Sequence, residues 1–145
     1  MLQTIMLNYL KRFKSSPSIS EVKYLPGKAH MISGMFYRTE SGNFYVKSNK
    51  RYKVYSERCL QSWATPVIDS KFANISHIPY AGILGFRDGT IIHNLSDGKI
   101  YIVSDNQKRQ IKTPDAFPEG WIEQYKILVS ESEANLHKDG PDING

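Results

Sequence analysis

Four histidines and one cysteine are the side chains of this 145-residue sequence that could carry nucleophilic or metal chemistry. Nucleophilic catalysis needs a nucleophile, a base and an orienting acid in contact. The histidines fall in four different expected elements, and no serine lies in a Gly-x-Ser-x-Gly turn; they are His30, His77, His93 and His137. Cys59 lies in a short expected helix, where a buried structural thiol is favoured over a nucleophile. We therefore expect no enzyme activity.

Metal and phosphate sites are not indicated either. His137, Asp139 and Asp142 could supply ligands, but a calcium loop needs more alternating acids than these. A single cysteine also excludes Cys-rich zinc modules. The stretch Gly82-Ile-Leu-Gly85 is followed by strand residues and lacks the helix N-terminus that phosphate-binding loops use. We therefore expect neither a metal nor a cofactor.

The two tryptophans, Trp63 and Trp121, are candidates for a binding role. An indole ring has a large apolar face and a polar edge, so either residue could stack on a sugar ring. Both occupy matching positions in the internal repeat described below, which favours core anchors. Glycan stacking on these rings stays open as the alternative.

The net charge of +5 and the sequence pI of about 9.3 are compatible with a nucleic-acid partner. A nucleic-acid surface presents several cations on one face beside stacking aromatic rings. Here the cations are dispersed, and Arg51-Tyr52-Lys53 alternates as a half-exposed strand does. We expect weak, salt-sensitive binding of nucleic acid at most, with no base readout. An acidic protein surface is the alternative partner for these cations.

Residues 1–32 are expected to form an N-terminal arm and linker. Apolar side chains recur there with the spacing of an amphipathic helix, and Pro17 and then Pro26-Gly27 interrupt the pattern. The apolar stripe consists of Leu2, Ile5, Met6, Tyr9, Leu10 and Phe13. We expect this stripe to bind a neighbouring subunit; the alternative is that it packs on its own domain.

Targeting and membrane segments are not expected. Lys11 and Arg12 follow the apolar stretch of the arm, whereas a secretory signal has its cations first and a cleavage site after the apolar run. No apolar run approaches the ~20 residues that span a bilayer.

The composition is that of a folded domain. Hydrophobic and charged fractions of 40% and 23% exclude wholesale disorder.

An internal repeat organises the rest of the chain when residues 33–80 are laid over residues 88–142. The alignment matches turn glycines, aromatic residues and both tryptophans. The matched pairs are Gly42 with Gly98, Tyr45 with Tyr101, Val46 with Ile102, Ser48 with Ser104, Val54 with Ile111, Ser56 with Thr113 and Trp63 with Trp121. We therefore divide the chain into the arm (1–32), copy one (33–82) and copy two (83–145).

Each copy is predicted to be a three-stranded meander followed by short helices. The expected strands span 36–38, 43–47 and 51–55 in copy one, and 91–93, 99–103 and 108–112 in copy two. Thr113-Pro114 starts a helix, and Ser130 with Glu133 forms a capping box. One copy alone buries little, so the two should share a core. The predicted fold class is α+β, mainly β: two copies of a three-stranded meander with short helices, plus an N-terminal arm.

Copy two resembles a short β-rich repeat that occurs in tandem in bacterial surface proteins and in virion proteins of tailed phages. The shared pattern is a glycine-led apolar strand, an aromatic strand, a Lys-Arg-x-Ile strand and a Ser/Thr-Pro helix start. It is carried by 86–92, 97–103, Lys108-Arg-Gln-Ile111 and Thr113-Pro114, and the resemblance covers about residues 33–143. Copy one departs from it, with Arg51-Tyr-Lys-Val54 in the third strand and no proline after Ser56.

The resemblance implies a protein without catalytic residues, because the repeated positions are turn, core and cap residues. It implies a non-enzymatic structural component of a tailed-phage virion, in the tail, neck or capsid. Its partners would be other virion proteins in a symmetric homo- or hetero-assembly, and the virion would assemble in the host cytoplasm. The alternative implied function is a glycan-binding or cell-wall-associated adhesion module.

Overall fold

The computed structural model of the chain describes residues 32–69 and 75–144. It is mainly β, with 41% strand and 18% helix, which confirms the predicted fold class. The predicted N-terminal arm lies outside the described residues. Among the described helices, none is long and apolar enough to cross a membrane.

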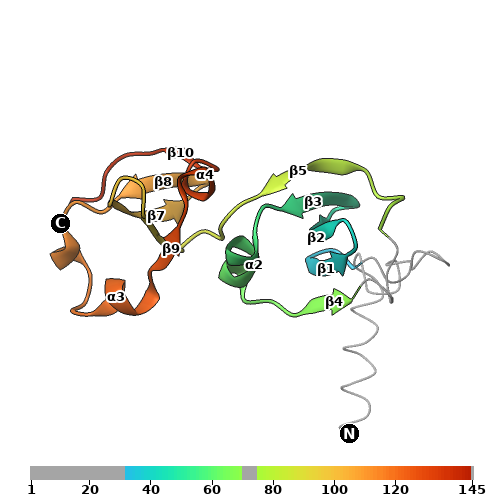
Figure 1. Ribbon diagram of the computed structural model, residues 1–145, viewed down its shortest axis with the longest axis horizontal. Coiled ribbons are helices and arrows are strands. Elements are labelled where there is room, and N and C mark those ends of the chain that lie inside the picture. Colours follow the sequence, from blue (N-terminus) through green and yellow to red (C-terminus); the bar gives the residue numbers. More distant parts are fainter. Residues whose placement is uncertain (1–31, 70–74, 145) are drawn as a thin grey trace, which may run out of the picture. The chain divides into compact units, whose positions relative to one another are not determined.

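Copy one forms a five-stranded sheet, which we call sheet A (Figure 1). Its strand order is β4-β1-β2-β3-β5, in which the antiparallel meander β1-β2-β3 is flanked by two strands that run parallel to their neighbours. The elements are β1 (Met35–Thr39), β2 (Gly42–Lys47), β3 (Lys50–Val54), α2 (Glu57–Trp63), β4 (Val67–Asp69) and β5 (Tyr80–Leu84). The predicted boundary between residues 82 and 83 falls inside β5.

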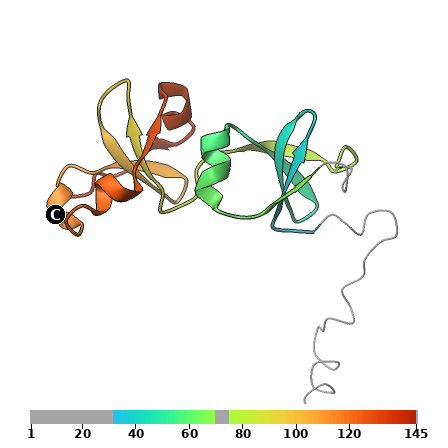
Figure 2. The same ribbon diagram turned by 60° about the horizontal axis from the view of Figure 1, so that its bottom comes forward.

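Copy two forms a second five-stranded sheet, sheet B, with the order β10-β8-β7-β6-β9. Its elements are β6 (Ile91–Asn94), β7 (Ile100–Ser104), β8 (Gln107–Gln110), the 3-10 helix η3 (Pro114–Ala116), α3 (Trp121–Tyr125), β9 (Ile127–Val129), α4 (Glu131–Ala134) and β10 (Lys138–Asp139). The two sheets have the same topology, because β6, β7, β8, β9 and β10 take the places of β1 to β5 in order. Figure 2 shows α2 against sheet A and α3 against sheet B.

Extended segments were expected at 65–68 and 125–129, where β4 and β9 lie, but sequence patterns did not predict the parallel pairing of the edge strands. The backbone of β4 pairs with β1 from Phe36 opposite Val67 to Arg38 opposite Asp69, and β9 pairs with β6 in the same way. A parallel neighbour reaches its partner only after a crossover connection. Its pairing therefore depends on how the intervening segment packs, and a local pattern does not contain that information.

The sequence alignment of the two copies is wrong by one residue in the second strand. Two-residue turns with positive φ at both positions join β2 to β3, at Ser48-Asn49, and β7 to β8, at Asp105-Asn106. Matching these turns puts Tyr45 on Ile102, not on Tyr101, although both tyrosines lie in equivalent strands. A shift of one residue moves a side chain to the other face of a sheet.

The cause of the shift is the first turn of each meander. In copy one, Thr39 pairs directly with Gly42, so the turn has two residues. In copy two, the Asn94 N–H donates to the Lys99 carbonyl at 2.9 Å, and four residues separate them. Copy two therefore has two extra residues in this turn. The predicted match of Gly42 with Gly98 allowed only one extra residue in this turn and assigned the other to the turn between the second and third strands.

Capping residues start the helices of both copies as predicted. Ser56 is the N-cap of α2, and its hydroxyl accepts a hydrogen bond from the Cys59 N–H at 3.3 Å. Ser130 and Glu133 form a full capping box at α4. Pro114 occupies the first turn of η3, although Thr113 makes no side-chain cap. Each cap satisfies amide groups that the first turn of a helix leaves without a partner.

The two copies share one apolar core, as the repeat predicts. From copy one it takes buried residues of β1, β3 and α2, and from copy two it takes residues of β6, β7, β9 and α4. They are Phe36, Val54, Cys59, Leu60, Phe86, Ile92, Tyr101, Val103, Val129 and Ala134. A smaller cluster lies on the other face of each sheet, around Tyr37 and Val46 in sheet A and around Ile91 and Ile122 in sheet B. Both sheets are thus covered on two faces.

Candidate binding surface around α3

Two buried polar clusters hold ionisable side chains, and both stabilise the fold. The first surrounds Glu133, which is 3% exposed. Its carboxylate accepts hydrogen bonds from the Ser56 hydroxyl at 2.6 Å, from Arg58 at 2.7 Å and from the Ser130 N–H at 3.0 Å. Burial works to raise the pKa of Glu133, but these donors outweigh burial and hold the pKa below its ordinary value of 4.5. The carboxylate is therefore a fixed anion that joins the two copies.

The second cluster surrounds His137, which is 2% exposed. The Phe86 N–H donates to its Nε2 at 3.0 Å, so the ring is neutral and its proton lies on Nδ1, 3.0 Å from the Asn106 side-chain oxygen. Burial lowers the pKa of His137 and keeps this neutral form. A Cβ on Gly85 would lie 2.6 Å from Nε2, so glycine is needed there for the ring to approach. His137 is a structural residue.

The other reactive side chains also give no catalytic constellation. Cys59 is fully buried, and burial raises the pKa of its thiol, which disfavours the reactive thiolate. His93 lies on β6 and His77 in the exposed loop before β5, while His30 lies outside the described residues. Within residues 32–69 and 75–144, no three His, Cys, Asp or Glu side chains are grouped as metal ligands would be.

Trp63 is a core residue, as its place in the repeat predicts. Its ring packs on Phe36 and Tyr45, with both centroids at 5.8 Å, and its Nε1–H donates to the Gly85 carbonyl at 3.0 Å. The polar edge of this indole is therefore bonded within the protein. Trp63 is poorly placed to stack on a sugar.

Trp121 has different surroundings, although it holds the equivalent place in copy two. It stacks on Phe117, with the ring centroids 5.1 Å apart and the planes 6° apart, and lies 5.4 Å from the half-exposed ring of Tyr125. The residues that replace Phe36 and Tyr45 are the aliphatic Ile91 and Ile102, which leave no aromatic cage. A ladder of three aromatic rings therefore runs along α3 and the segment before it.

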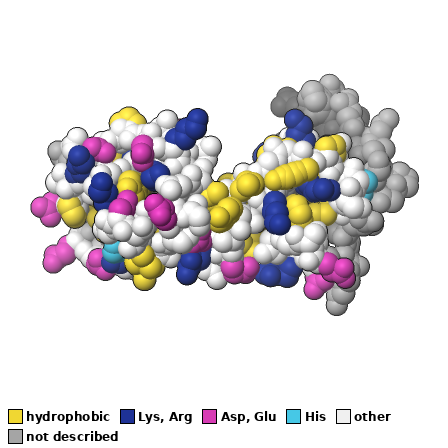
Figure 3. All heavy atoms as spheres, turned by 45° about the horizontal axis from the view of Figure 1, so that its top comes forward, with side chains coloured by type: hydrophobic (Ala, Val, Ile, Leu, Met, Phe, Trp, Pro, Cys, Tyr) yellow, Lys and Arg dark blue, Asp and Glu magenta, His cyan; other side chains and the backbone are white. Residues whose placement is uncertain are grey.

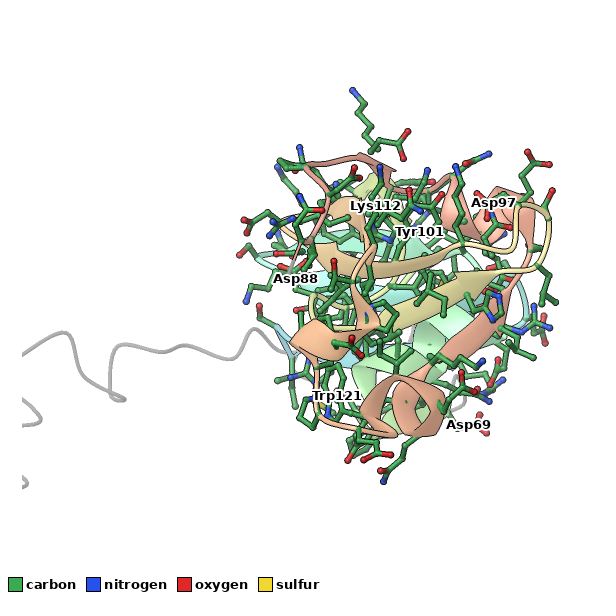
Figure 4. All side chains as sticks on the ribbon, turned by 90° about the vertical axis from the view of Figure 1, so that its left-hand side faces the viewer. Asp69, Asp88, Asp97, Tyr101, Lys112 and Trp121 are labelled. Carbon is green, nitrogen blue, oxygen red and sulfur yellow. The ribbon has the colours of Figure 1, made fainter. Side chains whose placement is uncertain are left out.

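A pocket of about 340 Å³ opens beside this ladder. Trp121 and Tyr125 line it together with polar residues that precede β6, among them Arg87, Asp88 and Thr90. In Figure 4, Asp88 and Trp121 lie on the same side of copy two. Aromatic faces with adjoining charged and hydroxyl groups are what a polar ring such as a sugar can use.

A larger groove of about 570 Å³ lies on the other side of α3. Its floor is apolar, formed by Ile100, Ile111, Pro114, Phe117, Pro118 and Ile122. Three carboxylates, Asp115, Glu119 and Glu123, stand around it. Glu123 forms an ion pair with Lys126 at 2.8 Å, whereas Asp115 and Glu119 have no ion pair with any residue that the structure describes. We call this feature the α3 groove.

The chemistry of the α3 groove selects its ligands by charge and polarity. Apolar side chains gain free energy when they leave water for such a floor, by roughly 25 cal/mol for each Å² buried. Carboxylates at the rim attract cations and repel phosphates. A protein segment that presents an apolar side chain beside Lys or Arg matches both features. A nucleic acid matches neither.

Sequence reasoning missed the α3 groove and placed its partner-binding residues elsewhere. The predicted stripe Leu2, Ile5, Met6, Tyr9, Leu10 and Phe13 lies outside the described residues. A signal for the groove was present, because Asp115, Glu119 and Glu123 are spaced by four in a stretch rich in proline and aromatic residues. That spacing alone does not show that the carboxylates surround an apolar floor, which Ile100 of β7 and Ile111, directly after β8, complete.

Comparisons with known protein families, with characterised proteins and with solved structures gave no match to this chain.

Proposed function

We propose that this chain is a non-enzymatic structural component of a tailed-phage virion that works through protein–protein contacts. The observation that carries the proposal is the α3 groove, whose apolar floor and carboxylates suit a protein segment. The phage setting is supported by the resemblance of copy two to the tandem repeat of virion proteins. The apolar stripe of the arm is the second proposed contact, made with a neighbouring subunit.

The polar clusters support a structural role rather than a catalytic one. The buried Lys, Glu and His side chains of the described residues, Lys108, Glu133 and His137, each bond to other parts of the fold. Lys108, for example, donates to the His137 carbonyl at 3.1 Å and to Asn135 at 3.2 Å. Glu133 also joins the two copies, through Ser56 and Arg58, which is what a repeated building block requires.

The test of the virion proposal is the composition of the particle. Phage particles purified by density gradient would be analysed by quantitative mass spectrometry for this chain. We expect it at a defined copy number per particle, resistant to a high-salt wash. Its absence from purified particles would contradict the proposal.

The contribution of the α3 groove is tested by charge reversal. A chain carrying Asp115→Lys and Glu119→Lys would be supplied in place of the natural one, and its incorporation into particles measured. The matched control is Glu40→Lys with Glu131→Lys, which changes the net charge equally at exposed sites outside the groove. We expect incorporation to fall for the groove variant alone.

Glycan binding is the second candidate function, and the pocket beside Trp121 is the observation that favours it. In a Trp63→Phe variant, Trp121 is the remaining tryptophan, so its fluorescence reports on this pocket. Saturable quenching by bacterial cell-wall oligosaccharides, lost in a Tyr125→Ala background, would support a glycan site. If glycans bind the natural chain on an array but leave the fluorescence of Trp121 unchanged, this pocket is not the glycan site.

A further inference from the structure

The two copies carry opposite net charges although they share a topology. Residues 33–82 contain seven Lys and Arg against three Asp and Glu, a net charge of +4. Residues 83–145 contain seven Lys and Arg against ten Asp and Glu, a net charge of −3. A chain with a basic half and an acidic half attracts further copies of itself when unlike halves meet.

Copy one presents an apolar surface flanked by cations at the edge of sheet A. On β5, Tyr80 is 49% exposed and Ile83 is 57% exposed. The register places Lys53 of β3 directly beside Ile83, so the two side chains share a face of the sheet. We call Lys53, Tyr80 and Ile83 the β5 strip. Figure 3 shows hydrophobic side chains interspersed with Lys and Arg over this part of the molecule.

The β5 strip has no charged partner within the described chain. Lys53 is exposed and forms no ion pair with another described residue, and β5 is the last strand of its sheet, with one side unpaired in the sheet order. Exposed apolar residues on an edge strand favour association with another chain. The strip thus offers an apolar side chain beside a cation, which is the chemistry that the α3 groove selects.

We infer that copies of this chain associate head to tail, with the β5 strip of one copy docked in the α3 groove of the next. The inference rests on the proposed function, and it names a second copy of this chain as a partner of the groove. Ile83 would meet the apolar floor around Phe117, and Lys53 would lie among Asp115 and Glu119. Because strip and groove are different surfaces, the contact is heterologous, and each added copy offers a new free surface until a ring closes.

The affinity of one such contact is expected to be low. Stable interfaces bury about 1,600 Å², and one edge strand in one groove offers less. Many copies held in one particle would raise the effective concentration and strengthen the contact. Association of the free protein should therefore depend on its concentration and on salt.

Reciprocal charge reversal in the full chain tests the contact. Sedimentation velocity would be measured over a concentration series at about 0.1 M and about 1 M salt, where the Debye length falls from about 10 Å to about 3 Å. The variants are Lys53→Glu, Glu119→Lys and the double variant. The matched control is Lys47→Glu, which changes the charge equally on the same sheet. Lys47 lies on the opposite face from Lys53, since Lys53 pairs with Phe44, three residues before Lys47 in β2.

The expected pattern is specific to this contact. The natural chain associates at about 0.1 M salt and dissociates at about 1 M. Lys53→Glu and Glu119→Lys each weaken association about three- to tenfold, an equimolar mixture of the two restores it, and the double variant associates again. Lys47→Glu behaves like the natural chain. As a test that changes no charge, Ile83→Ser weakens association at about 0.1 M salt.

Three results would overturn the inference: a natural chain that is monomeric throughout, equal behaviour of Lys53→Glu and Lys47→Glu, or no recovery on mixing. Loss of association on removal of residues 1–20, with Lys53→Glu unaffected, would assign self-association to the arm instead. Failure of the proposed function is seen separately, as absence of the chain from purified particles. A monomeric chain that is nevertheless present in particles would refute head-to-tail contact alone.

Discussion

The guanidinium of Arg58 in copy one lies 2.7 Å from the carboxylate of Glu133 in copy two, although 75 residues separate them in the chain. The Arg58 side chain is 53% exposed and that of Glu133 is 4% exposed. The pair therefore links a solvated cation to a buried carboxylate, which also accepts a hydrogen bond from the Ser56 hydroxyl. These contacts join the two copies at the polar edge of their shared core.

Removal of Glu133 should destabilise the fold more than removal of Arg58. Glu133→Ala takes away the N3 acceptor of the α4 capping box and the carboxylate to which the Ser56 hydroxyl donates, at a cost of about 2–3 kcal/mol in free energy of unfolding. Arg58→Ala leaves the carboxylate bonded to both serines and should cost about 1–2 kcal/mol. Chemical denaturation measures both. Arg38→Ala is the control, because its pair with Glu57 is exposed on both sides and worth less than about 1 kcal/mol. Equal effects of Arg58→Ala and Arg38→Ala would contradict the role of Glu133.

Burial of neutral His137 predicts a pH dependence of stability. Its pKa is lowered in the folded state from the ordinary 6.5, so the unfolded chain binds a proton more readily than the folded one. The contribution of His137 is complete above pH 6.5 and is lost as the pH falls from 6.5 toward the folded pKa, with a slope of at most about 1.4 kcal/mol per pH unit.

A His137→Gln variant isolates this effect. Glutamine can accept the Phe86 N–H but does not titrate, so the stability of the variant should not fall over that window. Urea unfolding between about pH 5 and pH 8 brackets the window, and proton NMR should show the His137 ring titrating below pH 6.5. A natural chain whose stability rises as the pH falls below 6.5 would show the opposite sign.

Tyr101 should ionise only at strongly alkaline pH. Burial and the hydrogen bond that its hydroxyl donates to Asp97 at 2.8 Å raise its pKa to about 12. The two residues are labelled in Figure 4. An ultraviolet titration of the natural chain should therefore contain a late step that Tyr101→Phe removes. The same variant should lose about 1 kcal/mol of stability with the hydrogen bond. Tyr55→Phe, at an exposed position, is the control that should leave the late step in place.

Deletion of residues 1–20 tests the proposed role of the arm. The apolar stripe Leu2, Ile5, Met6, Tyr9, Leu10 and Phe13 is expected to bind a neighbouring subunit, where each buried side chain is worth roughly 1.5–3 kcal/mol before ordering costs. The truncated chain should keep its circular dichroism spectrum and melting temperature but lose incorporation into particles. Unfolding of the truncated chain would mean that the arm belongs to its own core. Normal incorporation would place the interface on the repeats.

The local features of the repeat could be predicted because neighbouring residues determine them. Ser130 and Glu133 cap a helix through bonds three residues apart, and Ser48-Asn49 turns the chain through its own backbone angles. The meander strands followed from alternation between such turns. The predicted match of Tyr45 with Tyr101 failed where residue types were alike but turn lengths differed. Strand positions could be predicted but strand register could not, because register is set by the strand that pairs and not by a single strand.

The candidate site depended on tertiary structure. Trp63 and Trp121 have the same place in the topology, yet Trp63 is bonded to Gly85 and Trp121 lines a pocket, because different chain segments pack against each. The pattern Asp115, Glu119, Glu123 was visible in the sequence, but the apolar floor between them includes Ile100 and Ile111 from the sheet. The turns, the caps, the meanders and the mainly β class followed from the sequence alone, because neighbouring residues set them. The pairing of the parallel edge strands and the α3 groove depended on tertiary structure, because those contacts join residues far apart in the chain.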